Sequence, residues 1–297
     1  IASGVKGGGL IEVGGSWQNS DLSVRQASTT QIEEGAVLDA SAIVEGDGGE
    51  IVVWSDISNP ESVTTVAGSL LAKGGRQGGD GGEIETSGFE LDVVGIDIDA
   101  TASKGKQGLW LLDPFDYTLG SSEALAIKTA LEAGTDVTIS TAASTNTVGS
   151  DSVAATPGSE SDTAGTITVS SEINVDSGDG GSLSLIAGKD IQVNATLQNL
   201  SGSGDLTLSS KKGVAINPSG SINWDGGSSG LISISTSQSG GLTGSGPIAI
   251  GNGVLVVTQG STSEFGGIVS GSGGLQKNGG GFFRLTNNNT YSGPTFI

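Results

Sequence analysis

The sequence predicts an all-β protein whose short strands wind into the stacked coils of a parallel β-solenoid. Short runs in which apolar and polar residues alternate recur along the chain, as at 167–169, 183–185, 206–208 and 232–234. The chain has 53 glycines in 297 residues, and they punctuate these runs without the Gly-X-Y period of collagen. Aromatic residues make up only 4% of the chain, so we expect a thin, linear core. Such a fold carries function on an extended surface rather than in a pocket.

Residues 1–108 form the first group of predicted coils, which is acidic. Strand-like runs lie at 10–13, 22–24, 37–38, 51–54, 84–86, 91–93 and 96–99. In each run, alternate side chains can point inward. The turn Gly-Asp-Gly-Gly-Glu-Ile occurs at 46–51 and again at 79–84, 33 residues later. Because aspartate accepts backbone N–H bonds in such a turn and glycine supplies positive φ, we interpret this repeat as conformational.

Residues 109–140 differ from the coils. The segment 109–119 (LWLLDPFDYTL) is the densest apolar and aromatic run in the chain, and a short helix is predicted near 122–133, with Ser121 or Ser122 as its N-cap and Gly134 as its stop. Its apolar face is expected to comprise Ala124, Leu125, Ile127 and Leu131. Residues 136–140 return to strand. A single helix in a β chain is expected to cover an edge or one mouth of the core.

Residues 141–165 are rich in Ser, Thr, Asn and Ala and are interpreted as a surface loop, whereas 166–297 are interpreted as further coils. The first strand residue after each glycine turn marks one coil, and these markers are Leu183, Leu206, Ile232, Leu255 and Leu275. Their spacings of 23, 26, 23 and 20 residues fit coils of two or three short strands each. The variation predicts loops of different length in different coils.

Composition excludes several kinds of chemistry. The absence of cysteine, histidine and methionine removes thiol nucleophiles, disulfides, imidazole bases and the usual zinc ligands. The formal charge is −20, with 17 acids against 4 bases in residues 1–100 but 3 against 4 in 201–297. This field disfavours nucleic acid and anionic membranes and favours divalent cations or basic partners. Because the chain starts without methionine and stops in a strand-like run, we expect it to be a fragment of a longer protein.

The order of these segments resembles a known family. Glycine-rich coils precede GLWLLDPFDYTL at 108–119, the helix leads into LEAGTDVTI at 131–139, and GGSLSLIAGKDIQV follows at 180–193. This arrangement is similar to the filamentous-haemagglutinin-like exoproteins of two-partner secretion. The tail GLQKNGGGFFRLTNNNTYSG at 274–293 resembles the autotransporter-associated β-strand repeat.

The resemblance has consequences for fold, export and partners. It implies a right-handed parallel β-helix that is exported through an outer-membrane secretion pore. It also implies an adhesin that is secreted or held on the cell surface of a Gram-negative-type bacterium. The expected partners are a host or neighbouring-cell surface or a glycan.

We expect no catalytic site. A polysaccharide-cleaving β-helix needs clustered acids with Lys or Arg, or an Asp pair near His. Asp97 and Asp99 share one face of a strand, and Asp113 and Asp116 flank Pro114, but no base stands at a recognisable spacing. We interpret these aspartates as solvating one face or making turn hydrogen bonds.

A low-affinity calcium site is the next hypothesis. Its candidate ligands are Asp47, Glu50, Asp80 and Glu83, which can stack if their two coils are neighbours. Calcium takes six to eight oxygens, and each turn supplies few of them. The competing interpretation is that these residues only form turns.

Tryptophan side chains suggest a carbohydrate contact. Trp54 and Trp224 flank polar turns, where an exposed indole can stack on a sugar ring. Trp110 lies in the dense apolar run and is expected in the core or against the helix.

The function favoured by these patterns is a non-enzymatic adhesin or stalk, in which many weak sites add through multivalency. One alternative is a self-assembling extracellular fibre or sheath component, whose unpaired terminal strands join end to end. A second alternative is a β-helix protein that binds or cleaves polysaccharide.

Overall fold

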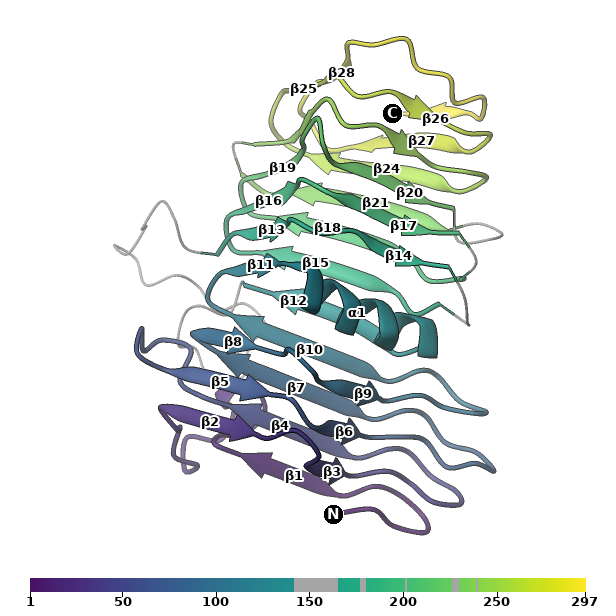
Figure 1. Cartoon of the computed structure of the whole chain (residues 1–297). Helices are drawn as coiled ribbons and strands as arrows, with labels where there is room; N and C mark the ends of the chain where they lie inside the picture. The colour runs from purple at the N-terminus through teal and green to yellow at the C-terminus, as the bar shows by residue number, and fades with distance from the viewer. Residues whose placement is uncertain (142–164, 177–179, 201, 226–229, 239) are drawn as a thin grey trace. The chain divides into compact units, whose positions relative to one another are not determined.

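The structure is a computed structural model that describes residues 1–141, 165–176, 180–200, 202–225, 230–238 and 240–297. The chain divides into two compact units, Ile1–Asp116 with Thr129–Ala164 and Tyr117–Lys128 with Gly165–Ile297. Within each unit the strands pair in parallel with the equivalent strands of the next coil (Figure 1). The predicted parallel β-helix is therefore confirmed.

The first unit has three parallel sheets. The first contains β1 (Leu10–Val13), β4 (Glu50–Trp54), β7 (Glu83–Gly88), β10 (Leu109–Pro114) and β12 (Asp136–Ser140). The second contains β2 (Thr29–Ile32), β5 (Val63–Val66) and β8 (Glu90–Asp92). The third contains β3 (Val37–Asp39), β6 (Ser69–Leu71) and β9 (Asp97–Asp99).

A ladder of inward side chains forms the core of the first unit. Ile51 on β4 pairs in register with Ile84 on β7, and Ile84 pairs with Trp110 on β10. All three side chains are fully buried. Ile51 and Ile84 are the last residues of the two Gly-Asp-Gly-Gly-Glu-Ile turns, so the two copies of this turn lie on neighbouring coils.

One predicted strand of the first unit is wrong. Residues 22–24 form a turn, because Asp21 Oδ1 accepts hydrogen bonds from both the backbone N–H and the hydroxyl of Ser23. This turn belongs to an excursion between β1 and β2 that also contains the 3-10 helix η1 (Trp17–Asn19). Leu22 at its tip is exposed. The apolar side chain of Leu22 is therefore not part of the core, although the sequence pattern suggested an inward strand position.

The second unit also has three parallel sheets. The first contains β15 (Leu183–Ala187), β18 (Leu206–Ser210), β21 (Leu231–Thr236), β24 (Val254–Gln259), β27 (Gly274–Asn278) and β29 (Thr295–Phe296). The second contains β11 (Tyr117–Leu119), β13 (Ile167–Val169), β16 (Asp190–Val193), β19 (Gly213–Ile216), β22 (Leu242–Gly244), β25 (Ser263–Phe265) and β28 (Phe283–Leu285). The third contains β14 (Ile173–Val175), β17 (Thr196–Asn199), β20 (Ser221–Trp224), β23 (Ile248–Ala249) and β26 (Val269–Ser270).

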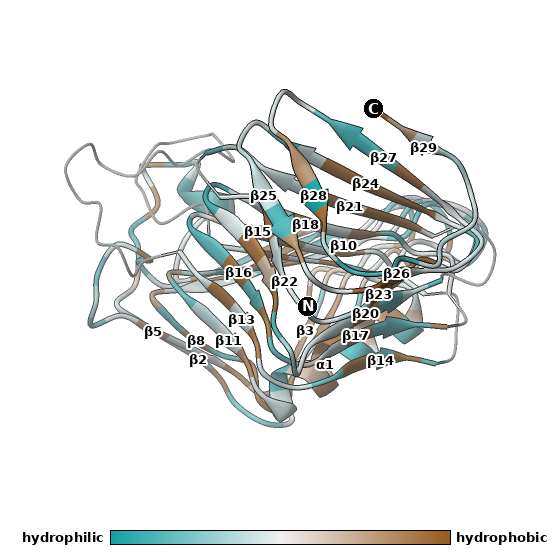
Figure 2. Cartoon of the chain, turned by 90° about the horizontal axis from the view of Figure 1, so that it is seen from above, coloured by the Kyte–Doolittle hydropathy of each residue, from teal (hydrophilic) through white to brown (hydrophobic). Residues whose placement is uncertain are grey.

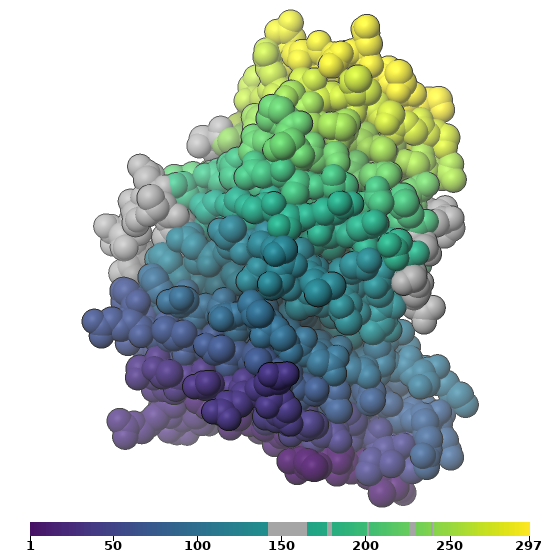
Figure 3. Space-filling model, viewed as in Figure 1, coloured from purple at the N-terminus to yellow at the C-terminus, as the bar shows by residue number. Residues whose placement is uncertain are grey.

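The predicted coil markers of the second unit form one continuous ladder. Leu183, Leu206, Ile232, Leu255 and Leu275 pair successively in register. Each is at most 4% exposed. Hydrophobic colour marks much of β21 and β24 in Figure 2, and in Figure 3 the residues of successive coils of each unit form successive colour bands. Each spacing between two successive markers in the sequence is therefore the length of one coil in the structure.

The helix α1 spans Ser121–Ala133. Both Ser121 and Ser122 lie inside it, so neither is the N-cap that the sequence suggested. Its end is as predicted, because Gly134 adopts φ +104 and donates its N–H to the carbonyl of Leu131. The buried side chains of α1 are Ala124, Ile127, Ala130 and Leu131, whereas Leu125 is 64% exposed. Leu125 was wrongly assigned to the apolar face because it follows Ala124 directly, and consecutive helical residues point in different directions.

The predicted surface loop 141–165 lies, apart from its two end residues, outside the described residues. Over the residues that are described, no helix is both long and apolar enough to cross a membrane.

Candidate functional site

The candidate site lies on the outer face of β4, β7 and β10 in the first unit. Because side chains alternate along a strand, the residues between the core positions point away from the core. The register places them in two rows, Val52–Glu85–Leu111 and Trp54–Ser87–Asp113. All six side chains are buried. Outward positions of a solenoid strand are expected to meet water, so something must cover this face.

Residues 14–27 cover part of it, and we call them the covering segment. Trp17 packs against the cluster of Val52, Trp54 and Ile57. The indole N–H of Trp54 donates to Gln26 Oε1 at 3.1 Å. These contacts make a second, small apolar core outside the main one.

The backbone of the covering segment is unusual at its contact with β7. Gln18 and Asn19 have φ values of 46° and 53°. Residues other than glycine rarely adopt this left-handed backbone conformation. The N–H of Gln18 donates to Glu85 Oε2 at 2.8 Å. A buried carboxyl group therefore fixes a locally strained turn, and strain of this kind tends to cluster at functional sites.

Glu85 is completely buried, and its two oxygens have partners. Besides the Gln18 N–H on Oε2, the Ser87 hydroxyl donates to Oε1 at 2.8 Å. Burial raises the pKa of Glu85 to about 8, because desolvation disfavours the charged form more than the two hydrogen bonds favour it. At neutral pH this carboxyl group is mostly protonated.

Asp113 is 1% exposed, and neither of its carboxyl oxygens has a hydrogen-bond partner. Asp113 pairs in register with Ser87 on the neighbouring strand β7. Ser87 is the next outward residue after Glu85 on that strand. Burial raises the pKa of Asp113 well above its ordinary value, and the negative charge of Glu85 raises it further. A buried carboxyl group without a partner costs free energy, so its presence calls for an explanation.

The donor atoms of this site define its chemistry. Two carboxyl groups and the Ser87 hydroxyl offer only oxygen. Throughout the described part of the chain, no group of three or more acidic, histidine or cysteine side chains is placed to hold a metal ion. The pair of Glu85 and Asp113 can store protons, or can exchange them for a hard cation.

The predicted calcium ligands form a corner ladder instead. Asp47 Oδ1 accepts the N–H of Asp80 at 2.8 Å, and Asp80 Oδ1 accepts the N–H of Lys106 at 2.8 Å. Glu50 and Glu83 are in register on neighbouring coils. Burial raises the pKa of Glu50, and the negative charge of Glu83 raises it further. The aspartates thus support the turn-forming interpretation, since their oxygens bind the backbone of the next coil.

The expectation that Trp54 and Trp224 are exposed for sugar stacking is wrong. Trp54 is 1% exposed beneath the covering segment, and Trp224 is completely buried with its indole N–H on the Gly204 carbonyl at 2.8 Å. The polar residues that flank each tryptophan suggested exposure, but other parts of the chain pack over both indoles. Trp110 is in the core as expected, and it donates to the Thr86 hydroxyl.

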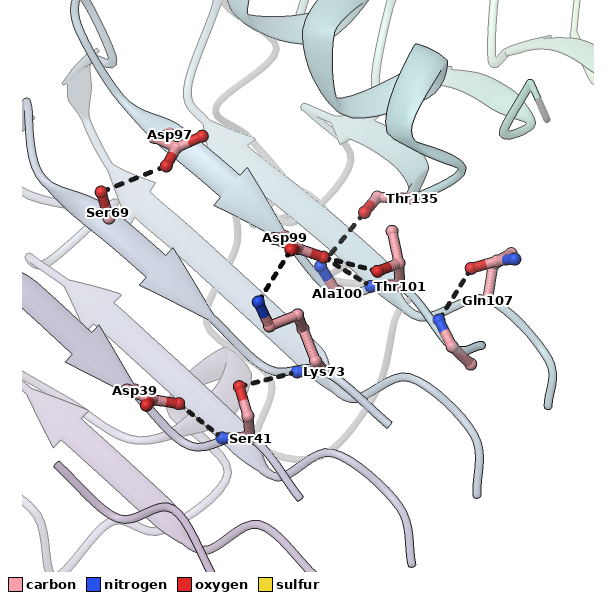
Figure 4. A network of polar contacts seen from close by, with 11 residues as sticks. Asp39, Ser41, Ser69, Lys73, Asp97, Asp99, Ala100, Thr101, Gln107 and Thr135 are labelled. Atoms are coloured by element: carbon pink, nitrogen blue, oxygen red, sulfur yellow. Dashed lines mark hydrogen bonds and ion pairs between the residues drawn. The ribbon is translucent and has the colours of Figure 1, made fainter. Parts of the chain in front are cut away.

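The aspartates weighed as catalytic pairs are not alike. Figure 4 shows Asp97 accepting a bond from the Ser69 hydroxyl, and Asp99 in an ion pair with Lys73 at 3.2 Å. These contacts hold β6 against β9. Asp113 is buried, whereas Asp116 is exposed, so the two do not share an environment. The interpretation that Asp113 solvates a face is wrong.

Sequence reasoning missed Glu85, Ser87 and Gln18. One signal was available: the unbroken apolar run of residues 51–54 departs from strict alternation, which indicates a strand buried on both faces. Nothing in the local sequence indicates that the excursion between β1 and β2 folds back over β7.

Comparisons with known proteins add no family. No protein-family model matches this sequence, and a search of curated proteins finds no significant match.

Proposed function

We propose that this chain is part of an exported adhesin or stalk of the two-partner-secretion type, which acts through repeated contacts on its coil surfaces. The proposal combines the resemblance of the segment 108–119 to that family with the regular coil pairing. The observation that carries it is the uncharged outer face of the first sheet of the second unit.

This neutral face carries rows of hydroxyl and amide side chains, while Ile186, Val254 and Val256 occupy other outward positions. One row runs Ser184–Thr207–Ser233 across β15, β18 and β21. The next row contains Ser209, Ser235, Thr258 and Asn278 across β18, β21, β24 and β27. All of these side chains are at least partly exposed. In a chain of formal charge −20, a repeated surface without a charged outward residue is distinctive.

The chemistry of the neutral face suits an uncharged glycan. Hydroxyl and amide groups both donate and accept, as the hydroxyl groups of a sugar do. Neighbouring strands lie about 4.8 Å apart, so equivalent groups repeat along each row. A polymer with its own repeat can engage several such groups, and weak contacts then add.

The test measures binding of the whole chain to an array of neutral glycans. We expect the biotinylated chain held on streptavidin tetramers to bind at least about tenfold more tightly than the free monomer, because linked sites gain avidity. Ser209→Glu with Ser235→Glu should abolish this binding. Thr168→Glu with Thr243→Glu adds the same charge to the neighbouring sheet of the same unit and should leave it intact. Binding that is equal in both double variants would overturn the proposal.

The two rival functions are distinguished in the same preparation. A polysaccharide-cleaving protein would release reducing ends from the glycans, whereas the adhesin proposal expects none. A self-assembling fibre would show concentration-dependent filaments by electron microscopy. Dispersed particles with glycan binding support the adhesin.

A further inference from the structure

We propose that Glu85 and Asp113 form a binding site for a hard divalent cation, with calcium as the first choice, on the outer face of β7 and β10 in the first unit. The site is separate from the glycan-binding face, because it uses other residues in the other unit. Either proposal can therefore fail without the other.

The donor set fits such an ion. Two carboxyl groups supply four oxygens, the Ser87 hydroxyl supplies a fifth, and all come from adjacent positions on β7 and β10. Two ionised carboxylates neutralise one divalent charge. Calcium prefers oxygen ligands and tolerates irregular geometry, whereas magnesium requires a nearly ideal octahedron.

Asp113 supplies the independent observation. Its two oxygens are buried without a hydrogen-bond partner, whereas the oxygens of Glu85 each have one. Buried polar groups in proteins are generally satisfied, so an unpartnered carboxyl beside a second carboxyl indicates a ligand-binding position. A cation would satisfy both groups at once.

The burial favours a small ion over a basic side chain of another protein. Glu85 and Asp113 are 0% and 1% exposed. The covering segment closes over Glu85 through the bond from Gln18, so a lysine or arginine side chain from outside does not reach the Glu85 carboxyl in the closed structure. An ion can enter during a brief opening of the segment and remain when it closes.

Proton release makes the proposal testable without knowing the affinity. Protonated carboxyl groups must lose their protons to bind a metal, so one cation replaces up to two protons, which pass to the solvent. We therefore expect calcium binding to the chelator-treated full chain, followed by calorimetry at pH 7 in two buffers of different ionisation enthalpy, to be accompanied by proton release.

The variants separate this site from the acidic surface. Asp113→Asn and Glu85→Gln should each lose the proton-linked calcium binding, with at least about a tenfold fall in affinity. Glu83→Gln removes an exposed carboxylate from the same strand and should bind as wild type does. Near-ultraviolet circular dichroism of each variant without calcium checks that the fold is retained.

Terbium gives a second readout, because Trp54 lies in the same outward row as Ser87 and Asp113 and can sensitise its emission. We expect sensitised emission that calcium displaces and that Asp113→Asn abolishes. Wild-type protein with no proton-linked binding would overturn the proposal. Equal binding in folded Asp113→Asn and Glu83→Gln would overturn it as well.

Discussion

The backbone N–H of Gln18 donates a 2.8 Å hydrogen bond to Glu85 Oε2, across 67 positions of the chain. The bond ties an excursion from the first coil to the outer face of β7. Glu85 therefore holds the covering segment in place while carrying a pKa of about 8, raised by burial. Closure of this segment is expected to depend on pH.

The sign of that dependence follows from the direction of the pKa shift. Glu85 titrates near 4.5 when exposed and near 8 when buried, so its stabilisation is complete below pH 4.5 and is lost as pH rises through 8. The loss over this range is roughly 4 to 5 kcal/mol, at about 1.4 kcal/mol per pKa unit. Denaturation followed by tryptophan fluorescence from pH 4 to 9, with chelator present, measures it. Glu85→Gln should make the profile shallower, with the contribution of Asp113 remaining; an unchanged profile would show that Glu85 is not responsible.

Removing the unpartnered carboxyl of Asp113 should stabilise the protein when no divalent cation is present. Asp113→Leu replaces it with an apolar side chain of similar size, and we expect the free energy of unfolding at pH 7 to rise by about 1 to 3 kcal/mol. Glu90→Leu, on the exposed face of β8, should change it by less than about 0.5 kcal/mol. A less stable Asp113→Leu protein would mean that the carboxyl has a partner even without cations.

Gly15 should be essential for close packing of the covering segment. A Cβ at this position would lie 2.3 Å from Trp54 Cδ1. Gly15→Ala is therefore expected to weaken docking of residues 14–27 by about 1 to 3 kcal/mol and to speed hydrogen exchange there. Gly78→Ala is the control in the same unit, since nothing lies within 4 Å of its added Cβ. Equal exchange in the two variants would contradict the packing argument.

The corner ladder predicts a difference between two replacements of Asp80. Asp80→Ala removes the acceptor for the Lys106 N–H and should cost about 1 kcal/mol of unfolding free energy. Asp80→Asn keeps a side-chain oxygen and should cost less than half as much. Chemical denaturation of both variants tests whether the aspartate acts as an acceptor, and an equal loss in both would show that its charge matters instead.

Lys277 occupies an inward position of the second unit, in register with Val257. Its ammonium donates to the backbone carbonyls of Gln259, Asn278 and Gly279. Lys277→Ala should cost about 2 kcal/mol or more, because it deletes packing and leaves carbonyls without a donor. Lys211→Ala serves as the control lysine. An equal effect of the two substitutions in thermal unfolding would refute this role.

The coil architecture could be predicted because it depends on local alternation. The markers from Leu183 to Leu275 are separated by glycine turns in sequence, and each marker pairs with the next in the structure. The helix and its end at Gly134 were also predictable, since the capping geometry is local.

The covered face could not be predicted in the same way. The burial of Glu85 and Trp54 depends on a segment that lies far earlier in the chain, and its polar, glycine-containing sequence resembles an ordinary loop. Alternation along the strand puts both side chains on the outward face, but it cannot show that this face is covered. A contact between segments that lie far apart in the chain produces no local sequence pattern, so a single sequence indicates it only indirectly.

The coils tolerate unequal length without loss of register. The coil that runs from Ile51 to Ile84 is much longer than the coil that runs from Leu255 to Leu275, yet both pairs lie side by side on neighbouring strands. The additional residues of a longer coil lie in the segments between its strands, and each coil has its own segments. A foreign peptide grafted into one of these turns should therefore leave adjacent strands undisturbed, making the scaffold suitable for antigen display.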